Sequence, residues 1–265
     1  MNITTAGSYH FDLFQNRDEE SRRLKQRAGM RLEGFIPLLK RHGLVDGMSV
    51  LEIGCGHGVR TSALARNFPN SQILGLDLSR ALLEEAKKNA FSNVRYLEGN
   101  AERLPFADGS VDFVYARLVF MHLRNPLAVI REVKRVLRPG GTFLIEDADR
   151  DFMNFNPAPP SWPEFWANIQ QGQRAQGGDP NVGRKLEDYL KLSGLGQIKV
   201  ELQPIHGGPE DVLELCHSLM PALNEYLPVE ERGPGTVAIR ELAELCRTRG
   251  TSLYHLWFVV SGRAP

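Results

Sequence analysis

The stretch VLEIGCGHG, residues Val50–Gly58, places a short apolar run directly before three glycines that stand two positions apart. The apolar run is typical of a short buried strand. A glycine has no Cβ atom, so it adopts positive φ and lets the main chain approach a ligand closely, at a cost in folding entropy. The sequence therefore predicts a turn that lies against a bound molecule; the alternative is a tight strand-to-helix turn without a ligand.

Strand and helix patterns alternate after this stretch, which predicts parallel strands joined by right-handed crossovers and hence a doubly wound α/β sheet. Ser79 is the expected N-cap of the second helix. In chain order the expected elements are a helix over 58–68, a strand over 72–77, a helix over 79–90, strands over 93–99 and 111–116, a helix over 125–137, a turn over 138–141 and a strand over 142–147.

The two flanking regions follow other patterns. Apolar residues recur at three and four positions over 18–42, which predicts one amphipathic helix with a kink at Pro37. Residues 151–180 hold five prolines and two tryptophans, which we interpret as an irregular excursion over the sheet, such as a lid. The remainder predicts helices over 183–195, 212–223 and 238–250, with strands over 197–203 and 253–262.

Composition narrows the classes of function. The chain has 265 residues with 32 Lys and Arg against 32 Asp and Glu, so no overall positive field attracts a nucleic acid or an anionic membrane. A small, weakly charged substrate suits this balance. The three cysteines are far apart without a CxxC pair, which argues against a zinc site or a disulfide framework and favours a reducing, cytoplasmic compartment. We expect no signal peptide, no membrane insertion and no metal site.

Asp77 is the second signal of a ligand. It ends a predicted strand about 20 residues after the glycine loop, a spacing at which an acid binds ribose hydroxyls. The alternative is an acid at a helix N-terminus, directly before Ser79. The dinucleotide fingerprint G-x-G-x-x-G requires glycine or alanine at position 59, where this chain has Val59, so an NAD-dependent oxidoreductase is disfavoured.

EIGCGHG (52–58) resembles motif I of the class I S-adenosylmethionine-dependent methyltransferases of the small-molecule type. Three further stretches resemble that family in the same order: ILGLDLS (73–79), GNAERLPFADGSVDFVYA (99–116) and VLRPGGTFLIED (136–147). The resemblance implies S-adenosylmethionine as cofactor and a Rossmann-like sheet of seven strands. It also implies an antiparallel last strand, an N-terminal helix and helical cap insertions.

The resemblance also implies which residues hold the cofactor. The methionine end would lie at the glycine loop, the ribose at the acid after the second strand, adenine beside the next residue and the following loop, and the sulfonium near the end of the fourth strand. Many relatives have aspartate where this chain has asparagine in the adenine loop. The implied residues are Glu52, Gly54, Cys55, Gly56, Gly58, Asp77, Leu78, Asn100, Ala101, Glu102 and Arg117.

We expect a single methyltransferase domain over 1–265. Residues 1–45 would form an N-terminal helical lid and 46–150 the cofactor-binding core. Residues 151–250 would form the substrate cap with the sixth strand, and 251–265 the terminal strand. The first and third of these regions are the ones expected to determine the substrate.

His122 is the first candidate for a catalytic base. It follows the fourth strand at the ligand end of the sheet, where an imidazole can take a proton from the methyl acceptor near neutral pH. The alternative is that it orders the loop before Pro126. Tyr9 and His10 are rival candidates, because the N-terminal segment folds over the cofactor in similar enzymes; the alternative for them is a frayed terminus.

Other side chains carry weaker hypotheses. Two acids after the fifth strand either orient a polar acceptor or form a solvated acidic loop. Three aromatic residues either wall an aromatic or isoprenoid pocket or fill the core of a small subdomain. One histidine and two cysteines stand among helix-spaced apolar residues and are expected in or near the core. The two acids are Asp147 and Asp149, the three aromatic residues are Trp162, Phe165 and Trp166, and the histidine and the two cysteines are His217, Cys216 and Cys246.

Our first hypothesis is a methyltransferase that acts by in-line displacement on an O, N or C atom of a small acceptor, such as a secondary metabolite or an aromatic or isoprenoid-like molecule. The second is a protein that binds the same cofactor but catalyses a cyclisation or isomerisation, or senses the cofactor. An RNA or protein methyltransferase is disfavoured by the neutral charge. We expect a monomer or a homodimer.

Overall fold

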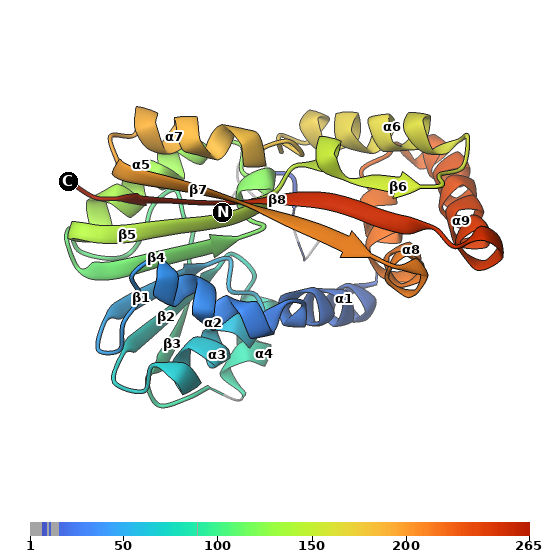
Figure 1. Ribbon diagram of the computed structural model, residues 1–265. Helices are drawn as coiled ribbons and strands as arrows, with labels where there is room; N and C mark the ends of the chain where they lie inside the picture. Colours follow the sequence, from blue (N-terminus) through green and yellow to red (C-terminus); the bar gives the residue numbers. More distant parts are fainter. Residues whose placement is uncertain (1–6, 10, 12–15, 89) are drawn as a thin grey trace.

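A computed structural model describes residues 7–9, 11, 16–88 and 90–265 of the chain. A sheet in the order β3-β2-β1-β4-β5-β8 forms its centre, with β7 and the short β6 both paired to β8 (Figure 1). Strands β1 to β5 are mutually parallel, as expected from their alternation with helices. The strands are β1 (Ser49–Ile53), β2 (Gln72–Asp77), β3 (Val94–Glu98), β4 (Val111–Arg117), β5 (Leu137–Ala148), β6 (Asn154–Asn156), β7 (Gly196–Gly207) and β8 (Ser252–Arg263).

Helices cover both faces of the sheet, because successive strand residues point to opposite faces. Val50 packs in the hydrophobic cluster under α2 (Leu32–Arg41) and α3 (Val59–Asn67), whereas Leu51 belongs to the cluster under α5 (Pro126–Val136) and α7 (Leu186–Leu192). Helix α4 (Arg80–Lys87) begins at the expected cap, since the Ser79 side chain accepts a hydrogen bond from Leu82 N. This part of the fold is the predicted doubly wound α/β core.

The last two strands form a long antiparallel pair that leaves the core, and the chain between them forms α8 and α9. β8 is antiparallel to β5 over Ala148 to Thr142, and β7 pairs with β8 along nearly its whole length. Figure 1 shows β7 and β8 running side by side from the sheet to a second group of helices. The antiparallel last strand expected from the family resemblance is therefore present, and it links the core to the cap.

The cap has a hydrophobic core of its own, built by α6 (Trp162–Ala175), α8 (Pro209–Asn224) and α9 (Arg232–Arg249) (Figure 1). The prediction of an irregular excursion over 151–180 is wrong, because this stretch contains β6 and α6. Four of the five prolines precede α6 or stand in its first turn, where a missing N–H is tolerated, and Pro180 follows the helix.

The N-terminal region is two helices, not one with a kink at Pro37. α1 (Arg17–Gly29) ends before Arg31, whose backbone is left-handed with φ 58°, and α2 then begins at Leu32. α1 bridges core and cap, since Ser21 Oγ lies 2.7 Å from His57 Nε2 and Gln26 donates a 2.6 Å hydrogen bond to Glu214 on α8.

The turn predicted over 138–141 is instead part of β5. The pairing of β5 with β4 shifts register between Val111 and Phe113, and Gly140 there has φ 76°. Between the paired residues on either side of this shift, β4 has one residue and β5 has four, 138–141, so the residues that predicted a turn form a bulge in β5. None of the described helices is both long and apolar enough to cross a membrane.

Candidate functional site

The glycine loop between β1 and α3 is built so that one of its glycines faces open space. Gly54, Gly56 and Gly58 all have positive φ, at 71°, 51° and 70°. A Cβ atom at Gly54 would overlap the side chain of Val119, and one at Gly58 would overlap the side chain of Tyr96. Packing therefore requires glycine at both positions. At Gly56 the nearest atom would be 4.0 Å away, so the backbone of this residue is accessible to a ligand.

Asp77, at the carboxyl end of β2, is fixed by two backbone donors. The N–H of Gly56 donates to its Oδ2 at 2.8 Å, and the N–H of Ser79 donates to its Oδ1 at 2.9 Å. These two bonds fix the carboxylate at the carboxyl end of β2, where an acid can accept hydrogen bonds from hydroxyl groups. The next residue, Leu78, leaves 45% of its surface exposed, which places an apolar side chain beside this carboxylate.

Glu52 is buried in β1, under the glycine loop. Its carboxylate accepts a 2.5 Å hydrogen bond from Thr61 Oγ1 on α3, and burial raises its pKa to about 7. The Glu52 carboxyl is therefore poised to lose its proton when a cation binds nearby. Cys55 is also buried, and burial raises the pKa of its thiol, which makes it a packing residue of the loop.

The loop after β3 holds the three residues assigned to adenine. Asn100 Oδ1 accepts a 2.9 Å hydrogen bond from the backbone N–H of Glu102, and Ala101 is buried between them. The amide of Asn100 therefore shapes this loop, and its Nδ2 and the second lone pair of Oδ1 remain for a base.

Arg117 stands at the end of β4, as expected, but its guanidinium is directed to protein groups. It lies 3.3 Å from Glu146 Oε1, donates to the carbonyl of Arg27 at 3.4 Å, and stacks 4.7 Å from the ring centroid of Trp257. It thus ties the core to α1 and β8, and its role toward a sulfonium stays a prediction.

His122, in the short 3-10 helix after β4, is the point at which the N-terminal segment closes over the sheet. Its Nδ1 lies 3.2 Å from Ser8 Oγ and 3.3 Å from the hydroxyl of Tyr226, and its carbonyl accepts a 2.8 Å hydrogen bond from Ser8 N. The ring of Tyr9 packs against it at 5.3 Å between centroids. The other candidate of this segment, His10, lies outside the described residues.

Tyr9 is held by the buried pair of Glu20 and Arg23 on α1. Its hydroxyl donates to Glu20, which also forms an ion pair with Arg23. Burial and the Glu20 charge raise the pKa of Tyr9 far above neutral pH, so the phenol stays protonated. The structure therefore brings Tyr9 and His122 together but gives Tyr9 a buried acceptor of its own.

Asp147, near the end of β5, and Asp149, just after it, are both buried, so the interpretation as a solvated acidic loop is wrong. Asp147 accepts hydrogen bonds from the N–H groups of Met121 (3.2 Å) and Ala148 (2.8 Å), and burial raises its pKa to about 7. Asp149 forms an ion pair with Arg184. Both acids order the loops at the carboxyl end of the sheet.

The aromatic residues of α6 fill the core of the cap, which was the second of the two interpretations. Trp162 stacks on Trp166 at 5.4 Å and meets Phe165 edge-on, and all three are buried. Cys216 and Cys246 are buried in the same core, as expected. His217 is exposed, so its placement in the core was wrong, because it lies on the outer face of α8.

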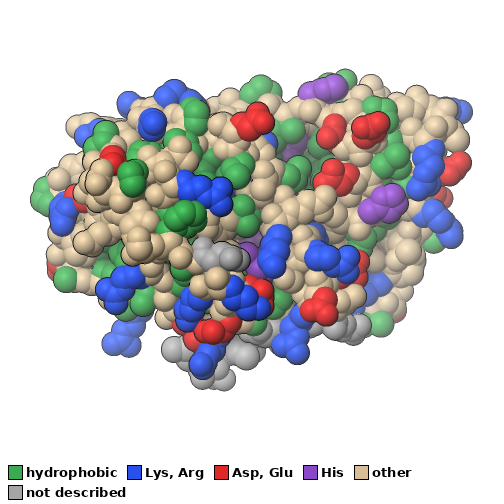
Figure 2. Space-filling model, turned by 90° about the horizontal axis from the view of Figure 1, so that it is seen from below, with side chains coloured by type: hydrophobic (Ala, Val, Ile, Leu, Met, Phe, Trp, Pro, Cys, Tyr) green, Lys and Arg blue, Asp and Glu red, His purple; other side chains and the backbone are tan. Residues whose placement is uncertain are grey.

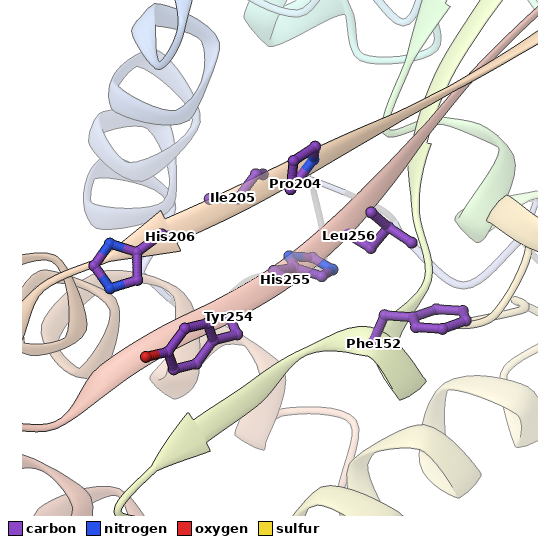
Figure 3. Close-up of a pocket in the computed structure, with 7 residues that line it drawn as sticks. All are labelled: Phe152, Pro204, Ile205, His206, Tyr254, His255 and Leu256. Atoms are coloured by element: carbon purple, nitrogen blue, oxygen red, sulfur yellow. The ribbon is translucent and has the colours of Figure 1, made fainter.

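A groove of about 420 Å³ lies on the face of the paired strands β7 and β8 (Figure 3). Side chains from both strands and from the segment before β6 line it, and none belongs to the glycine loop. They are Phe152, Pro204, Ile205, His206, Tyr254, His255 and Leu256. The groove is therefore separate from the candidate cofactor site.

Several polar residues at the junction of α1, the core and the cap were not among the candidates. His57, inside the glycine motif, bonds to α1, and burial lowers its pKa to about 4, so it is neutral. The Tyr226 hydroxyl lies 3.3 Å from His122 Nδ1, and the Arg150 guanidinium lies 5.7 Å from the centroid of the Tyr226 ring. The only feature of the sequence that links Arg23 to Arg27 is their spacing of four residues on α1.

The surface gives no sign of a nucleic-acid site on the face seen in Figure 2. Basic and acidic side chains are interspersed there, and the described residues of this face form no continuous basic stripe. Direct binding of a polyanion requires clustered lysine and arginine.

A family model described as "Methyltransferase domain" matches residues 51–145. Methyltransferase str3 of Strobilurus tenacellus is 30% identical over 197 residues, which cover 71% of this chain and 69% of that protein. Demethylmenaquinone methyltransferase of Lactococcus lactis subsp. lactis is 39% identical over 108 residues, 39% of this chain and 43% of that enzyme. The chain thus matches less than half the length of some curated relatives.

Among solved structures, phosphoethanolamine N-methyltransferase 2 of Haemonchus contortus, in complex with S-adenosyl-L-methionine, is similar in fold. The TM-score is 0.57 at 22% identity, and the match covers 87% of this chain and 52% of that one.

Proposed function

Since the chain belongs to the class I S-adenosylmethionine-dependent methyltransferases, we propose that it transfers a methyl group from S-adenosylmethionine to a nucleophilic atom of a small molecule. The observation that carries this proposal is the open backbone of Gly56 joined to Asp77. Bound S-adenosylmethionine supplies an electrophilic methyl group on a sulfonium, so the residues of the chain have to bind, align and exclude water.

The residues at the carboxyl ends of β1, β2 and β3 fit this cofactor. Asp77 presents a carboxylate, a group that accepts hydrogen bonds from ribose hydroxyls, and the exposed side chain of Leu78 offers an apolar surface to adenine. Glu52 lies below the glycine loop, where its carboxylate attracts the amino group of the methionine end, and Asn100 offers amide groups to the base. Arg117 positions α1 and β8 around the cofactor through its contacts to Arg27 and Trp257.

His122 is our candidate for the base that accepts the proton of the methyl acceptor. Ser8 and Tyr226 flank its Nδ1, so they orient the ring and set the tautomer. Tyr9 packs on the ring and closes the N-terminal segment over it, which excludes water from the same place. With Tyr9 protonated and bonded to Glu20, the imidazole is the better base of the two.

The acceptor would enter between α1 and the cap. The cap is joined to the core by the paired strands β7 and β8 and by α1, so a small acceptor suits the space better than a macromolecule. The relatives carry names of different chemistry: one is named for demethylmenaquinone and the other only as a methyltransferase. We therefore propose a small organic acceptor and leave the methylated atom, O, N or C, to experiment.

The test is to incubate the protein with S-adenosylmethionine labelled in its methyl group and an extract of its source organism. Label is then counted in the small-molecule, protein and RNA fractions. The proposal predicts label in the small-molecule fraction, and Asp77→Ala as a cofactor-binding control should remove it. Label confined to protein or RNA would overturn the small-molecule assignment. Cofactor binding with no label in any fraction would favour the non-methylating alternative.

A further inference from the structure

Four arginines from distant parts of the chain meet where α1 and the cap approach the carboxyl ends of β4 and β5. Arg23 and Arg27 come from α1, Arg117 ends β4, and Arg150 follows β5. The residues Arg23 and Arg150 are 7% and 5% exposed, so their charges are buried. α1 extends from the core toward the cap in Figure 1, which explains how its arginines reach this junction.

Only two of these arginines have a carboxylate partner within the described residues. Arg23 pairs with Glu20 and Arg117 with Glu146. Neither Arg27 nor Arg150 forms an ion pair with a described carboxylate. The nearby Asp147 is bonded to two backbone N–H groups, and its raised pKa leaves it only partly charged at neutral pH.

Two guanidinium nitrogens in this group are buried without a hydrogen-bond partner among the described residues, Nη1 of Arg23 and Nη1 of Arg150. A buried charged donor without an acceptor is costly, and arginine does not escape the cost by losing its proton. Burial and the charges of Arg23, Arg117 and Arg150 lower the pKa of Arg27 to about 9, which still leaves it charged.

The other groups at the junction do not neutralise this excess of positive charge. Arg150 lies 5.7 Å from the ring centroid of Tyr226, whose hydroxyl is near His122. His255 on β8 is neutral, because burial lowers its pKa to about 4, and its Nε2 is also buried without a partner. The arginines therefore face aromatic and neutral groups beside the proposed base.

We propose that the methyl acceptor is an acidic small molecule whose oxyanion group, a carboxylate or a phosphate, binds Arg150 and Arg27 at this junction. Arginine presents a planar fork of donors that matches both groups. The free Nη1 of Arg150 supplies such a donor, and the nearby ring of Tyr226 can pack against an apolar part of the same molecule. This inference rests on the proposed function, and it identifies the class of substrate.

The test measures thermal unfolding of the protein loaded with S-adenosylhomocysteine, in the presence of benzoate, phenyl phosphate or benzyl alcohol at equal millimolar concentration. One or both anions should raise Tm by a few degrees, while neutral benzyl alcohol should not. The anion that raises Tm more, benzoate or phenyl phosphate, shows whether the site prefers a carboxylate or a phosphate. Equal shifts with the alcohol and the anions, or no shift with any of them, would overturn the inference.

Two variants separate a ligand site from a structural arginine. In Arg150→Met the anion-dependent shift should disappear, and Tm without an anion should rise, because the variant removes an unpaired buried charge. Arg95→Gln, at an exposed arginine on β3, is the control and should keep the shift. If Arg150→Met keeps the anion shift, or lowers Tm without an anion, the inference is wrong.

Calorimetry of S-adenosylhomocysteine binding on the same proteins keeps the two claims apart. If the cofactor product does not bind, the proposed function fails. If it binds while the anions have no effect, only the acidic acceptor fails.

Discussion

The backbone N–H of Gly56 lies 2.8 Å from Oδ2 of Asp77, so the glycine loop after β1 and the carboxyl end of β2 are fixed to each other. The second oxygen of the same carboxylate accepts from Ser79 N at 2.9 Å, at the start of α4. One aspartate thus orders both walls of the proposed cofactor site, at the position where we propose that the ribose binds.

Asp77→Ala should raise the Kd of S-adenosylhomocysteine about 10- to 100-fold, because a hydrogen bond to a charged group contributes about 1.5–3 kcal/mol. Isothermal titration calorimetry measures this change. Glu84→Gln is a suitable control, since Glu84 is an exposed acid on the neighbouring helix α4. An unchanged Kd in Asp77→Ala, with the fold intact, would show that the ribose is not held here.

Gly56→Ala and Gly58→Ala should behave differently although both glycines have positive φ. In each variant the left-handed backbone of the new alanine lowers the free energy of unfolding by about 1–2 kcal/mol. At Gly58 the new methyl group also overlaps Tyr96, so this variant should unfold at a clearly lower temperature. At Gly56 the methyl group enters open space, so the main loss should be in cofactor affinity. Equal Tm values for the two variants would contradict this account.

Glu52 should make the protein less stable as pH rises from about 4.5 to 7. The folded state keeps the proton, because burial raises the pKa of Glu52 to about 7, while the unfolded chain loses it near the ordinary value of about 4.3. The unfolded state then binds fewer protons, so stability falls by up to about 3 kcal/mol over this range.

Glu52→Gln should remove this contribution, so urea unfolding at pH 5 and pH 8 should differ less in the variant than in the wild type. The raised pKa of Asp147 acts in the same direction, so a smaller slope should remain and should disappear in the double variant with Asp147→Asn. A wild-type stability that rises between pH 5 and 7 would contradict the burial of these two acids as the dominant effect.

His122→Gln should lower kcat about 10²- to 10⁴-fold with little change in cofactor affinity if the imidazole accepts the acceptor proton. The competing role is that His122 only anchors the N-terminal segment through Ser8. Ser8→Ala is therefore the matched variant: it weakens the anchor and keeps the imidazole. If both variants lose the same activity, His122 acts as an anchor and not as a base.

Much of the fold could be predicted from the sequence, because local pattern and tertiary packing agree in the core. Val50 and Leu51 alternate between the two faces of the sheet, and Ser79 and Asn125 cap the helices that follow them. The residues assigned to the cofactor lie at the carboxyl ends of four adjacent strands, β3, β2, β1 and β4, as the topological rule for open α/β sheets requires.

The errors arose where one strong local signal hid another. Pro37 suggested a kink, yet the helix breaks at Met30 and Arg31, just after the glycine that ends α1. The prolines before α6 suggested a loop, although Trp162, Phe165, Trp166 and Ile169 have helical spacing. A proline in the first turn of a helix is compatible with that helix, so the apolar period was the better guide.

The arginine group could not be read from the sequence. Arg23, Arg117 and Arg150 are separated by more than thirty positions along the chain, and each is an ordinary arginine in its own segment. Only the placement of α1 across the carboxyl end of the sheet brings their charges together. The overall charge balance, which favoured a weakly charged substrate, carries no information about such a local excess.

The most direct test of the central claim is the balance between cofactor turnover and product. The protein is given methyl-labelled S-adenosylmethionine and the small-molecule fraction of its source organism, and both S-adenosylhomocysteine and labelled small molecules are quantified over time. The account predicts that the two accumulate in equal amounts, and that Asp77→Ala slows both alike. Bound cofactor that yields no S-adenosylhomocysteine, or S-adenosylhomocysteine without a labelled small molecule, would contradict it.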